Sequence, residues 1–212
     1  MKTFLHKPPS YYRMPDSPEF ELIAKFKAGD VSVFNLLTRR WYEKILGFLY
    51  RVLGNMEDAE DACQKTFITV YTRLHQLNEP AKFRSWLYRI ANNNAMDLLN
   101  DRKHIARSRT NGESEDPHID LDGPDTEAAD LESRIDLVGL HILFEKIMLS
   151  IPEEQRVVIV MKLYQDMKFS EIAETLNVPL NTVKTRMYSG LRAMKDSLAR
   201  NKLIEEILKD AM

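Results

Sequence analysis

Uninterrupted helical periodicity is the feature that most constrains how this chain can fold. Apolar residues recur at steps of three and four through the first half of the sequence, a spacing that places them on one side of an α-helix. Only 7 glycines occur in 212 residues, so few positions favour tight turns. No stretch has the pattern of a strand, and we therefore expect an all-α fold. The helices expected in the first half are Phe20–Phe26, Val31–Leu53, Asp58–Leu74 and Phe83–His104.

A strongly acidic segment divides the chain. Residues 107–132 carry nine Asp or Glu against two Lys or Arg, whereas the sequence on either side has a small excess of basic residues. The part at 107–130 is rich in Gly, Ser and Pro, a composition typical of a flexible linker. It would join two small helical domains at 19–106 and 131–212, and residues 1–18, which lack any period, would form an N-terminal tail. Such charge blocks favour a nucleic-acid or polymerase partner.

The second half opens with helical periodicity from Leu131 to Met148. Ile151-Pro152 then starts another helix, because proline is tolerated in a first helical turn. The residues expected on its apolar face are Val157, Val158, Met161 and Leu163.

Residues 168–198 follow the pattern of a helix-turn-helix. Ser170 is the expected N-cap of a short first helix, and Asn181 or Thr182 is expected to cap the second. The turn between them is Asn177-Val178-Pro179, with Val178 in the core. The residues expected to be buried are Ile172, Ala173 and Leu176 in the first helix, and Val183, Met187, Leu191, Met194 and Leu198 in the second.

The other side of the second helix carries short polar and basic groups. Groups of this kind near a helix N-terminus can donate hydrogen bonds to phosphates and to guanine edges in the major groove. A solvated face is the alternative for any one residue, but the whole pattern favours binding of duplex DNA. The residues expected to bind are Asn181, Thr182, Lys184, Thr185, Arg186, Tyr188, Ser189 and Arg192.

Several runs of sequence together resemble a known family. Asp58–Phe67 and Phe83–Asn93 closely resemble region 2 of extracytoplasmic-function sigma factors, a subfamily of the sigma-70 family. Region 4 of the same family is resembled by three later runs, Ile151–Arg156, Glu171–Ala173 and Thr182–Arg186. The resemblance implies a protein that binds core RNA polymerase and directs promoter recognition, melting of the −10 element and transcription initiation. It also implies control by an anti-sigma factor. We expect the protein to be cytoplasmic, because no apolar run has the length of a membrane span or of a signal-peptide core.

The resemblance assigns a polymerase-binding role to the third expected helix. It implies that Asp58, Asp61 and Gln64 face the coiled coil of the largest polymerase subunit, with the flap region as a second contact of the chain. Family members usually have Glu where this chain has Lys65. Acidic residues also suit any helix start, because they complement the helix dipole, so a solvated acidic surface is the alternative.

The fourth expected helix has a face that mixes arginine, asparagine and tyrosine. Aromatic rings can stack on the bases of single-stranded DNA while cations track its phosphates. By resemblance this region opens the −10 element, and the loop His75–Lys82 holds a flipped base. We expect Trp86 in the core rather than stacked on a base. The residues expected to bind −10 DNA are Asn78, Lys82, Arg84, Ser85, Tyr88, Arg89, Asn92 and Asn93.

Region 4 of the family reads the −35 element of duplex promoter DNA, and here the chain departs from the family. Many members have arginines where this chain has Ser189 and Leu191. Lys184, Arg186 and Arg192 would then carry more of the phosphate contact, with a weaker dependence of binding on salt. The acidic linker has two open interpretations: a solvated tether, or a segment resembling the one that threads the polymerase active-site cleft in this family.

Other classes of protein explain less of the sequence. A dimeric helix-turn-helix regulator could dimerise through the apolar stripe Leu198–Leu208, but it leaves the region 2 runs unexplained. A helical adaptor that binds only protein leaves the recognition face unexplained. We expect no enzyme, no cofactor and no metal, since phosphate-loop, metal-ligand and nucleophile motifs are absent. The single cysteine, Cys63, is expected to be an inert thiol, and no apolar run is long enough for membrane insertion.

Overall fold

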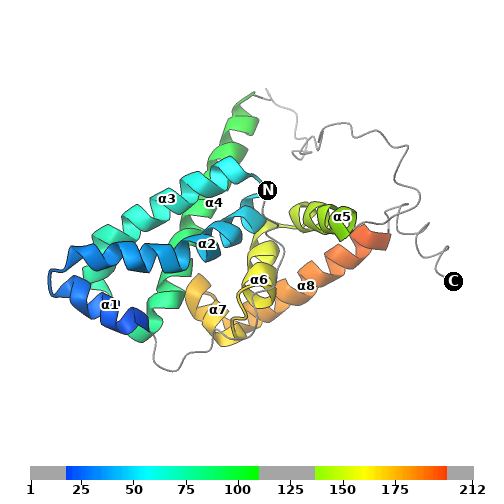
Figure 1. Cartoon of the computed structure of the whole chain (residues 1–212). Helices are drawn as coiled ribbons and strands as arrows, with labels where there is room; N and C mark the ends of the chain where they lie inside the picture. The colour runs from blue at the N-terminus through cyan, green and yellow to red at the C-terminus, as the bar shows by residue number, and fades with distance from the viewer. Residues whose placement is uncertain (1–17, 110–136, 200–212) are drawn as a thin grey trace.

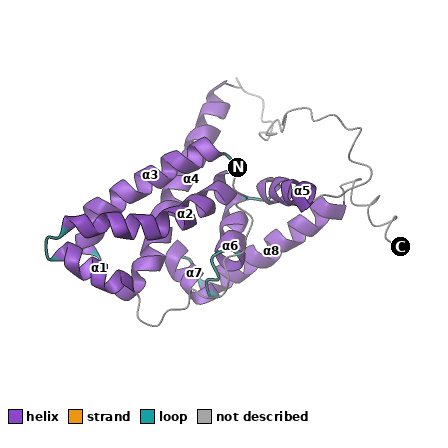
Figure 2. Ribbon diagram, in the orientation of Figure 1, coloured by secondary structure: helices purple, strands orange, loops and turns teal. Residues whose placement is uncertain are grey.

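The computed structural model describes residues 18–109 and 137–199, which form helices with no strand among them (Figure 2). The all-α prediction is confirmed for these residues. Four parts of the earlier predictions lie outside the described residues: 1–17 of the expected tail, 110–130 of the expected linker, 131–136, and 200–208 of the apolar stripe. The elements are α1 (Pro18–Lys27), η2 (Val31–Val33), α2 (Phe34–Leu53), α3 (Met56–Arg73), η3 (Leu74–Gln76), η4 (Pro80–Lys82), α4 (Phe83–Arg109), α5 (Leu137–Ser150), α6 (Glu153–Leu163), α7 (Phe169–Leu176) and α8 (Leu180–Ala199).

The N-terminal lobe is built on α2 and α3, which lie antiparallel (Figure 1). Gly54 ends α2 in a left-handed conformation (φ 73°), where a residue without a side chain costs least. The Asn55 side chain then caps α3 by accepting a hydrogen bond from the Asp58 N–H at 3.1 Å. Helix α4 packs along both, and the core between them includes Cys63. Burial raises the pKa of the Cys63 thiol to about 12, which fits the expected inert thiol.

The C-terminal lobe begins its helix-turn-helix with a cap that differs from the predicted one. Ser170 lies inside α7, and the N-cap is Lys168, whose backbone N–H donates to the Glu171 carboxylate at 2.6 Å. The Glu171 carboxylate thus satisfies a backbone N–H group at the start of α7. Asn177 ends α7 in the left-handed conformation (φ 53°), as the predicted turn requires. Because α8 begins at Leu180, Asn181 and Thr182 lie in its first turn and are not caps.

The buried side of α8 is close to the predicted stripe, with one exchange. Val183, Met187 and Met194 are buried as expected, but Leu191 is 39% exposed. Gly190 is buried in its place, because α6 approaches α8 there: a Cβ atom on Gly190 would lie 2.7 Å from Cδ1 of Ile159. The prediction that Leu163 lies on the apolar face of α6 is also wrong, because this residue at the end of the helix is 46% exposed.

The two lobes pack directly against each other. Helix α7 lies on α4, and α2 contacts both α5 and α6, so that buried side chains of the two lobes form one continuous core (Figure 1). Arg156 of α6 is buried at this junction and donates a hydrogen bond to the carbonyl oxygen of Val52 at 2.6 Å. None of the described helices is both long and apolar enough to span a membrane.

Candidate nucleic-acid and polymerase interface

The recognition face of α8 points away from the core. Its opposite side packs on α6 and α7 through the buried stripe, so the helix is held rigidly with one face open. Arg186 is half-buried and its guanidinium pairs with the carboxylate of Glu154 in α6. Thr182 is also half-buried. The remaining predicted residues are exposed: Asn181, Lys184, Thr185, Tyr188, Ser189 and Arg192.

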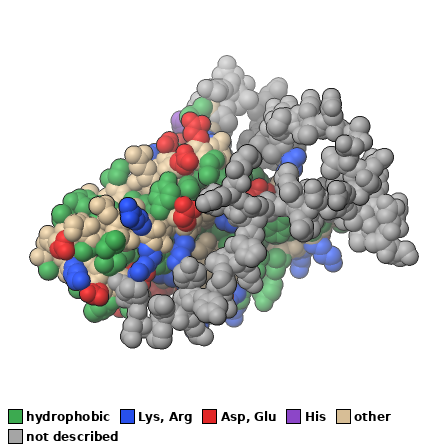
Figure 3. All heavy atoms as spheres, viewed as in Figure 1, with side chains coloured by type: hydrophobic (Ala, Val, Ile, Leu, Met, Phe, Trp, Pro, Cys, Tyr) green, Lys and Arg blue, Asp and Glu red, His purple; other side chains and the backbone are tan. Residues whose placement is uncertain are grey.

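The predicted polymerase-binding residues on α3 differ in their exposure to solvent. Asp61 and Gln64 are exposed. Asp58 is half-buried, and its carboxylate pairs with the Arg102 guanidinium of α4, a contact within the N-terminal lobe. Figure 3 shows basic, acidic and apolar side chains interspersed on the visible face of the described residues. On α3 the acidic positions are therefore split between an internal ion pair and the open surface.

The sequence analysis did not single out Ile68, which lies one helical turn after Gln64 on the same side of α3. Its side chain is 58% exposed, and Leu36 of α2 is 55% exposed. Large exposed apolar side chains beside polar ones are typical of protein-binding surfaces. Ile68 lies off the apolar stripe of α3, and that departure from periodicity was the one signal that could have marked it.

Only some of the residues predicted to bind −10 DNA are exposed to solvent. Asn78, Lys82 and Asn93 are exposed, whereas Arg84, Ser85, Arg89 and Asn92 are half-buried. The prediction that Tyr88 lies on an exposed face is wrong, because its side chain is completely buried. Its ring meets Phe48 and Trp41 edge-on, with centroids 5.2 Å and 6.2 Å away, and burial raises the pKa of its hydroxyl. Trp86 is partly buried and packs against the core, as expected.

Four of these residues surround one pocket. Asn78, Lys82, Ser85 and Arg89 line an open cavity of about 250 Å³, together with Trp86 and part of the loop that precedes α4. One wall comes from the other lobe, where Glu174 of α7 faces Lys82 with 3.3 Å between Oε1 and Nζ. The hydrogen bonds of Lys82 to Glu79 and Glu174 raise its pKa. The pocket is thus lined by polar, cationic and aromatic groups that suit a nucleobase and its phosphate.

Arg84 and Asn92 lie outside this pocket. The Arg84 guanidinium donates to the carbonyl oxygen of Gln165 in the loop between α6 and α7. The buried Oδ1 of Asn92 has no hydrogen-bond partner among the described residues. The structure therefore gathers only part of the predicted −10 set into one site.

Comparison with known proteins places both lobes in one family. The sigma-70 region 2 family matches residues 37–105, and the sigma-70 region 4 family matches residues 141–194. The chain is 32% identical over 187 residues to the ECF RNA polymerase sigma factor SigW of Bacillus subtilis, covering 83% of this chain and 94% of SigW. It is 26% identical over 201 residues to the RNA polymerase sigma-H factor of Pseudomonas aeruginosa, covering 90% of this chain and 96% of that protein.

Solved structures show the same fold. The structure of CnrH in complex with the cytosolic domain of CnrY is matched with a TM-score of 0.59 at 21% identity, over 86% of this chain and 98% of CnrH. The sigma factor RpoE of Bartonella quintana, in complex with the anti-sigma factor NepR, is matched with a TM-score of 0.58 at 16% identity, over 79% of this chain and 98% of that one. With region 2 and region 4 in order and a relative matched along nearly its whole length, the chain belongs to the extracytoplasmic-function group of the sigma-70 family of RNA polymerase sigma factors.

Proposed function

We propose that this sigma factor divides promoter binding between its lobes, with α8 on the duplex −35 element. The exposed face of α8 carries the proposal: six polar or basic residues are open to solvent on a helix whose other side is buried. Lys184 and Arg192 are exposed cations there, while Arg186 must first release Glu154. The helix N-terminus adds backbone N–H groups suited to a phosphate. The role is binding in the cytoplasm, and no catalytic step is assigned to any residue.

The N-terminal lobe would bind the −10 element as single-stranded DNA. The pocket between Asn78 and Arg89 offers cations for phosphates and polar groups for a base edge. Asn93, exposed one helical turn beyond Arg89, would extend this surface along α4. Tyr88 contributes from the core, by holding α4 against Phe48, rather than by stacking on a base.

The exposed side of α3 would bind the coiled coil of the largest polymerase subunit. Asp61 and Gln64 supply polar contacts, and Ile68 adds an apolar anchor of the kind that dominates protein interfaces. Asp58 is assigned a smaller part, since it pairs with Arg102. The flap region is the proposed contact of the C-terminal lobe. An anti-sigma factor is a further proposed partner, because a structural neighbour is a sigma factor bound to one.

Reconstituted transcription tests this division of labour. Core RNA polymerase, genomic fragments and the full chain should give specific run-off transcripts. Lys184→Ala should lower transcription from promoters that depend on the −35 element roughly ten-fold and leave binding to core polymerase unchanged. Lys195→Ala, an exposed lysine nearer the end of α8, is the matched control and should have little effect.

A polymerase-binding variant tests the other lobe. Ile68→Asp should weaken binding to core polymerase, measured by co-migration in size-exclusion chromatography, without changing binding to duplex DNA. Loss of core binding in Lys184→Ala, or normal core binding in Ile68→Asp, would contradict the assignment. Tight binding to isolated duplex operators with no transcript under any condition would favour a helix-turn-helix repressor instead.

A further inference from the structure

Helix α6 brings a carboxylate to the edge of the recognition face of α8. Glu154, in the first turn of α6, accepts a hydrogen bond from Nη2 of Arg186 and forms an ion pair with it. The Glu154 side chain is 64% exposed, whereas that of Arg186 is 23% exposed. Lys184 and Arg192, two other basic residues of this face, are classed as exposed. Arg186 is therefore less exposed than either, and its guanidinium is tied to another helix.

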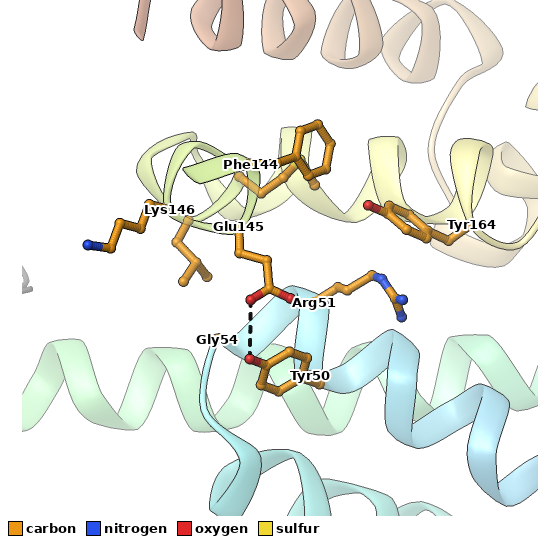
Figure 4. Close-up of a pocket in the computed structure, with 9 residues that line it drawn as sticks. Tyr50, Arg51, Gly54, Phe144, Glu145, Lys146 and Tyr164 are labelled. Atoms are coloured by element: carbon orange, nitrogen blue, oxygen red, sulfur yellow. Dashed lines mark hydrogen bonds between the residues drawn. The ribbon is translucent and has the colours of Figure 1, made fainter. Parts of the chain in front are cut away.

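The start of α6, which carries this carboxylate, is held firmly. The two helices approach closely one turn of α8 further on, where a Cβ atom on Gly190 would lie 3.1 Å from Cβ of Gln155. Arg156 is buried and donates to two carbonyl oxygens just before α6. At the other end of α6, the Arg51 guanidinium of α2 lies over the ring of Tyr164, 4.2 Å from its centroid (Figure 4). The carboxylate is thus presented to α8 from a fixed helix.

The neighbouring acid has a different partner. Glu153 pairs with Lys103 of α4, so the two acids in the first turn of α6 reach different helices. Both suit the positive end of the helix dipole, and the dipole alone does not require either pairing. The contact between Glu154 and Arg186 is therefore a separate feature of the helix-turn-helix lobe, in which an acid reaches the helix assigned to DNA.

The ion pair uses only a small part of the guanidinium. A guanidinium has five N–H donors in one plane, and the hydrogen bond to Glu154 uses a donor on Nη2. An arginine whose direction is already fixed loses less conformational freedom when it binds DNA. Arg186 directly follows the exposed Thr185, so it borders the side of α8 that is assigned to the major groove. The remaining donors are therefore placed to serve a DNA acceptor there.

A carboxylate beside the guanidinium favours a base over a phosphate as its partner. A phosphate is negative and is repelled by Glu154, so it must displace this carboxylate to bind Arg186. The O6 and N7 acceptors of guanine belong to a neutral base, and an arginine can bind both in one plane. Lys184 and Arg192 are more exposed and suit phosphates. The ion pair thus distinguishes Arg186 from the other cations of the recognition face.

We propose that Glu154 is a positioning residue that holds Arg186 for a guanine edge in the major groove and keeps it from phosphates. Glu154 thereby raises the preference of the protein for its own −35 sequence over other duplex DNA. The proposal rests on the assignment of α8 to the −35 element, and it adds a residue of α6 to the reading of sequence.

Duplex binding of the full chain tests the proposal. The wild-type chain first selects its preferred duplex from a library with randomised base pairs. Anisotropy then gives the affinities for the selected duplex and for the unselected library. Glu154→Gln keeps the size of the side chain and removes its charge. This variant should bind the library roughly three-fold more tightly, because Arg186 is released to a phosphate, and should bind the selected duplex no more tightly than the wild type does.

The salt dependence shows whether Arg186 moves to a phosphate. The plot of log affinity for the library against log salt should steepen by about 0.9 in Glu154→Gln, since one more phosphate is neutralised. Glu21→Gln removes the same charge from an exposed ion pair on α1, and it should leave both affinities and the slope almost unchanged. Equal slopes in Glu154→Gln and Glu21→Gln would overturn the proposal.

A second variant shows whether Glu154 acts through Arg186. Arg186→Ala should weaken binding to the selected duplex by roughly ten-fold and leave the affinity for the library almost unchanged. Adding Glu154→Gln to Arg186→Ala should then have little effect on either affinity, because no guanidinium is left to release. An equal gain in library affinity with and without Arg186→Ala would mean that Glu154 only repels DNA in general, and would also overturn the proposal.

Lys184→Ala separates failure of this proposal from failure of the assigned function. If Lys184→Ala weakens duplex binding, α8 binds DNA, and an unchanged sequence preference in Glu154→Gln then overturns only the positioning role. If the wild-type chain selects no sequence, or if Lys184→Ala binds duplexes as tightly as the wild type, the assignment of α8 to the −35 element fails. The positioning role of Glu154 fails with it.

Discussion

The guanidinium of Arg156 in α6 donates to the carbonyl oxygen of Val52 at the end of α2, with 2.6 Å between Nη1 and the oxygen. Nη2 donates to the carbonyl oxygens of Ile151 and Leu149 at 3.2 Å and 3.3 Å. The residue is 5% exposed, and burial lowers its pKa from the usual value. An arginine nevertheless stays charged at neutral pH. A buried cation on the negative end of α2 therefore ties the lobes together.

Arg156→Ala should lower the free energy of unfolding by about 2–4 kcal/mol, because three carbonyls, two of them in buried contacts, lose their donor and a cavity forms. Arg156→Lys should lose less, since one ammonium can still reach part of this set. The measurement is the midpoint of urea unfolding for the full chain. Lys195→Ala, a basic residue exposed on α8, should change stability by no more than about 0.5 kcal/mol. Equal midpoints for all three variants would show that Arg156 does not tie the lobes.

Two glycines, Gly47 within α2 and Gly54 just after it, should respond oppositely to alanine. At Gly54 a Cβ atom would lie 2.5 Å from Cδ2 of Leu149 in the other lobe, and the backbone is left-handed (φ 73°). Gly54→Ala should therefore destabilise the protein by about 1–3 kcal/mol. At Gly47, inside the helix, the nearest atom is Nη1 of Arg51 at 3.0 Å, at the far end of a flexible side chain that can shift by a few tenths of an ångström.

Gly47→Ala should stabilise the protein by about 0.5–1 kcal/mol, because alanine favours the helix interior. Thermal unfolding of both variants checks the pair. The same sign of change in melting temperature for both would contradict the packing of Leu149 on Gly54.

The ion pair between Lys103 and Glu153 should make stability depend on pH. Burial alone would raise the pKa of Glu153, but hydrogen bonds from Lys103 and the backbone outweigh it and hold this pKa below its usual value. A carboxyl with a lowered pKa in the folded state adds stability above its unfolded value of about 4.3, and that stability is lost as the pH falls through the folded value.

Glu153→Gln should therefore narrow the difference in stability between neutral pH and acid, measured as urea midpoints at a series of pH values. Glu21 also pairs with a lysine, but it is exposed on α1. Glu21→Gln should leave the acid dependence almost unchanged, because exposed pairs contribute little. If the pH dependence of the urea midpoint is the same with and without Glu153→Gln, the contact between Lys103 and Glu153 is not a source of that dependence.

Sequence periodicity predicted most helices, since each lobe buries one stripe of each helix. It failed where a helix packs on more than one side. Tyr88 lies on the polar side of α4 by periodicity, yet Phe48 and Trp41 bury its ring and Gln165 accepts from its hydroxyl. A pattern read along one helix does not show that α2 and the loop between α6 and α7 both pack on the polar side of α4.

Gly190 and Leu191 show a different limit. A glycine adds nothing to a hydrophobic pattern, so periodicity predicts that the buried stripe of α8 continues through Leu191. The structure buries Gly190 because only a residue without a side chain lets Ile159 approach so closely. Close approach of two helices depends on their crossing, which the spacing of apolar residues within one helix does not determine.

Leu191 is consequently exposed on α8, at a position where many family members have arginine. Leu191→Arg should add one phosphate contact if this face meets the DNA backbone. The plot of log affinity for a labelled duplex against log salt should then steepen by about 0.9. Leu163→Arg, at an apolar position of α6 that is 46% exposed, adds the same charge outside the recognition helix and should leave the slope almost unchanged. Anisotropy titrations over a series of NaCl concentrations measure both slopes, and equal slopes in the two variants would place duplex DNA on another surface of the protein.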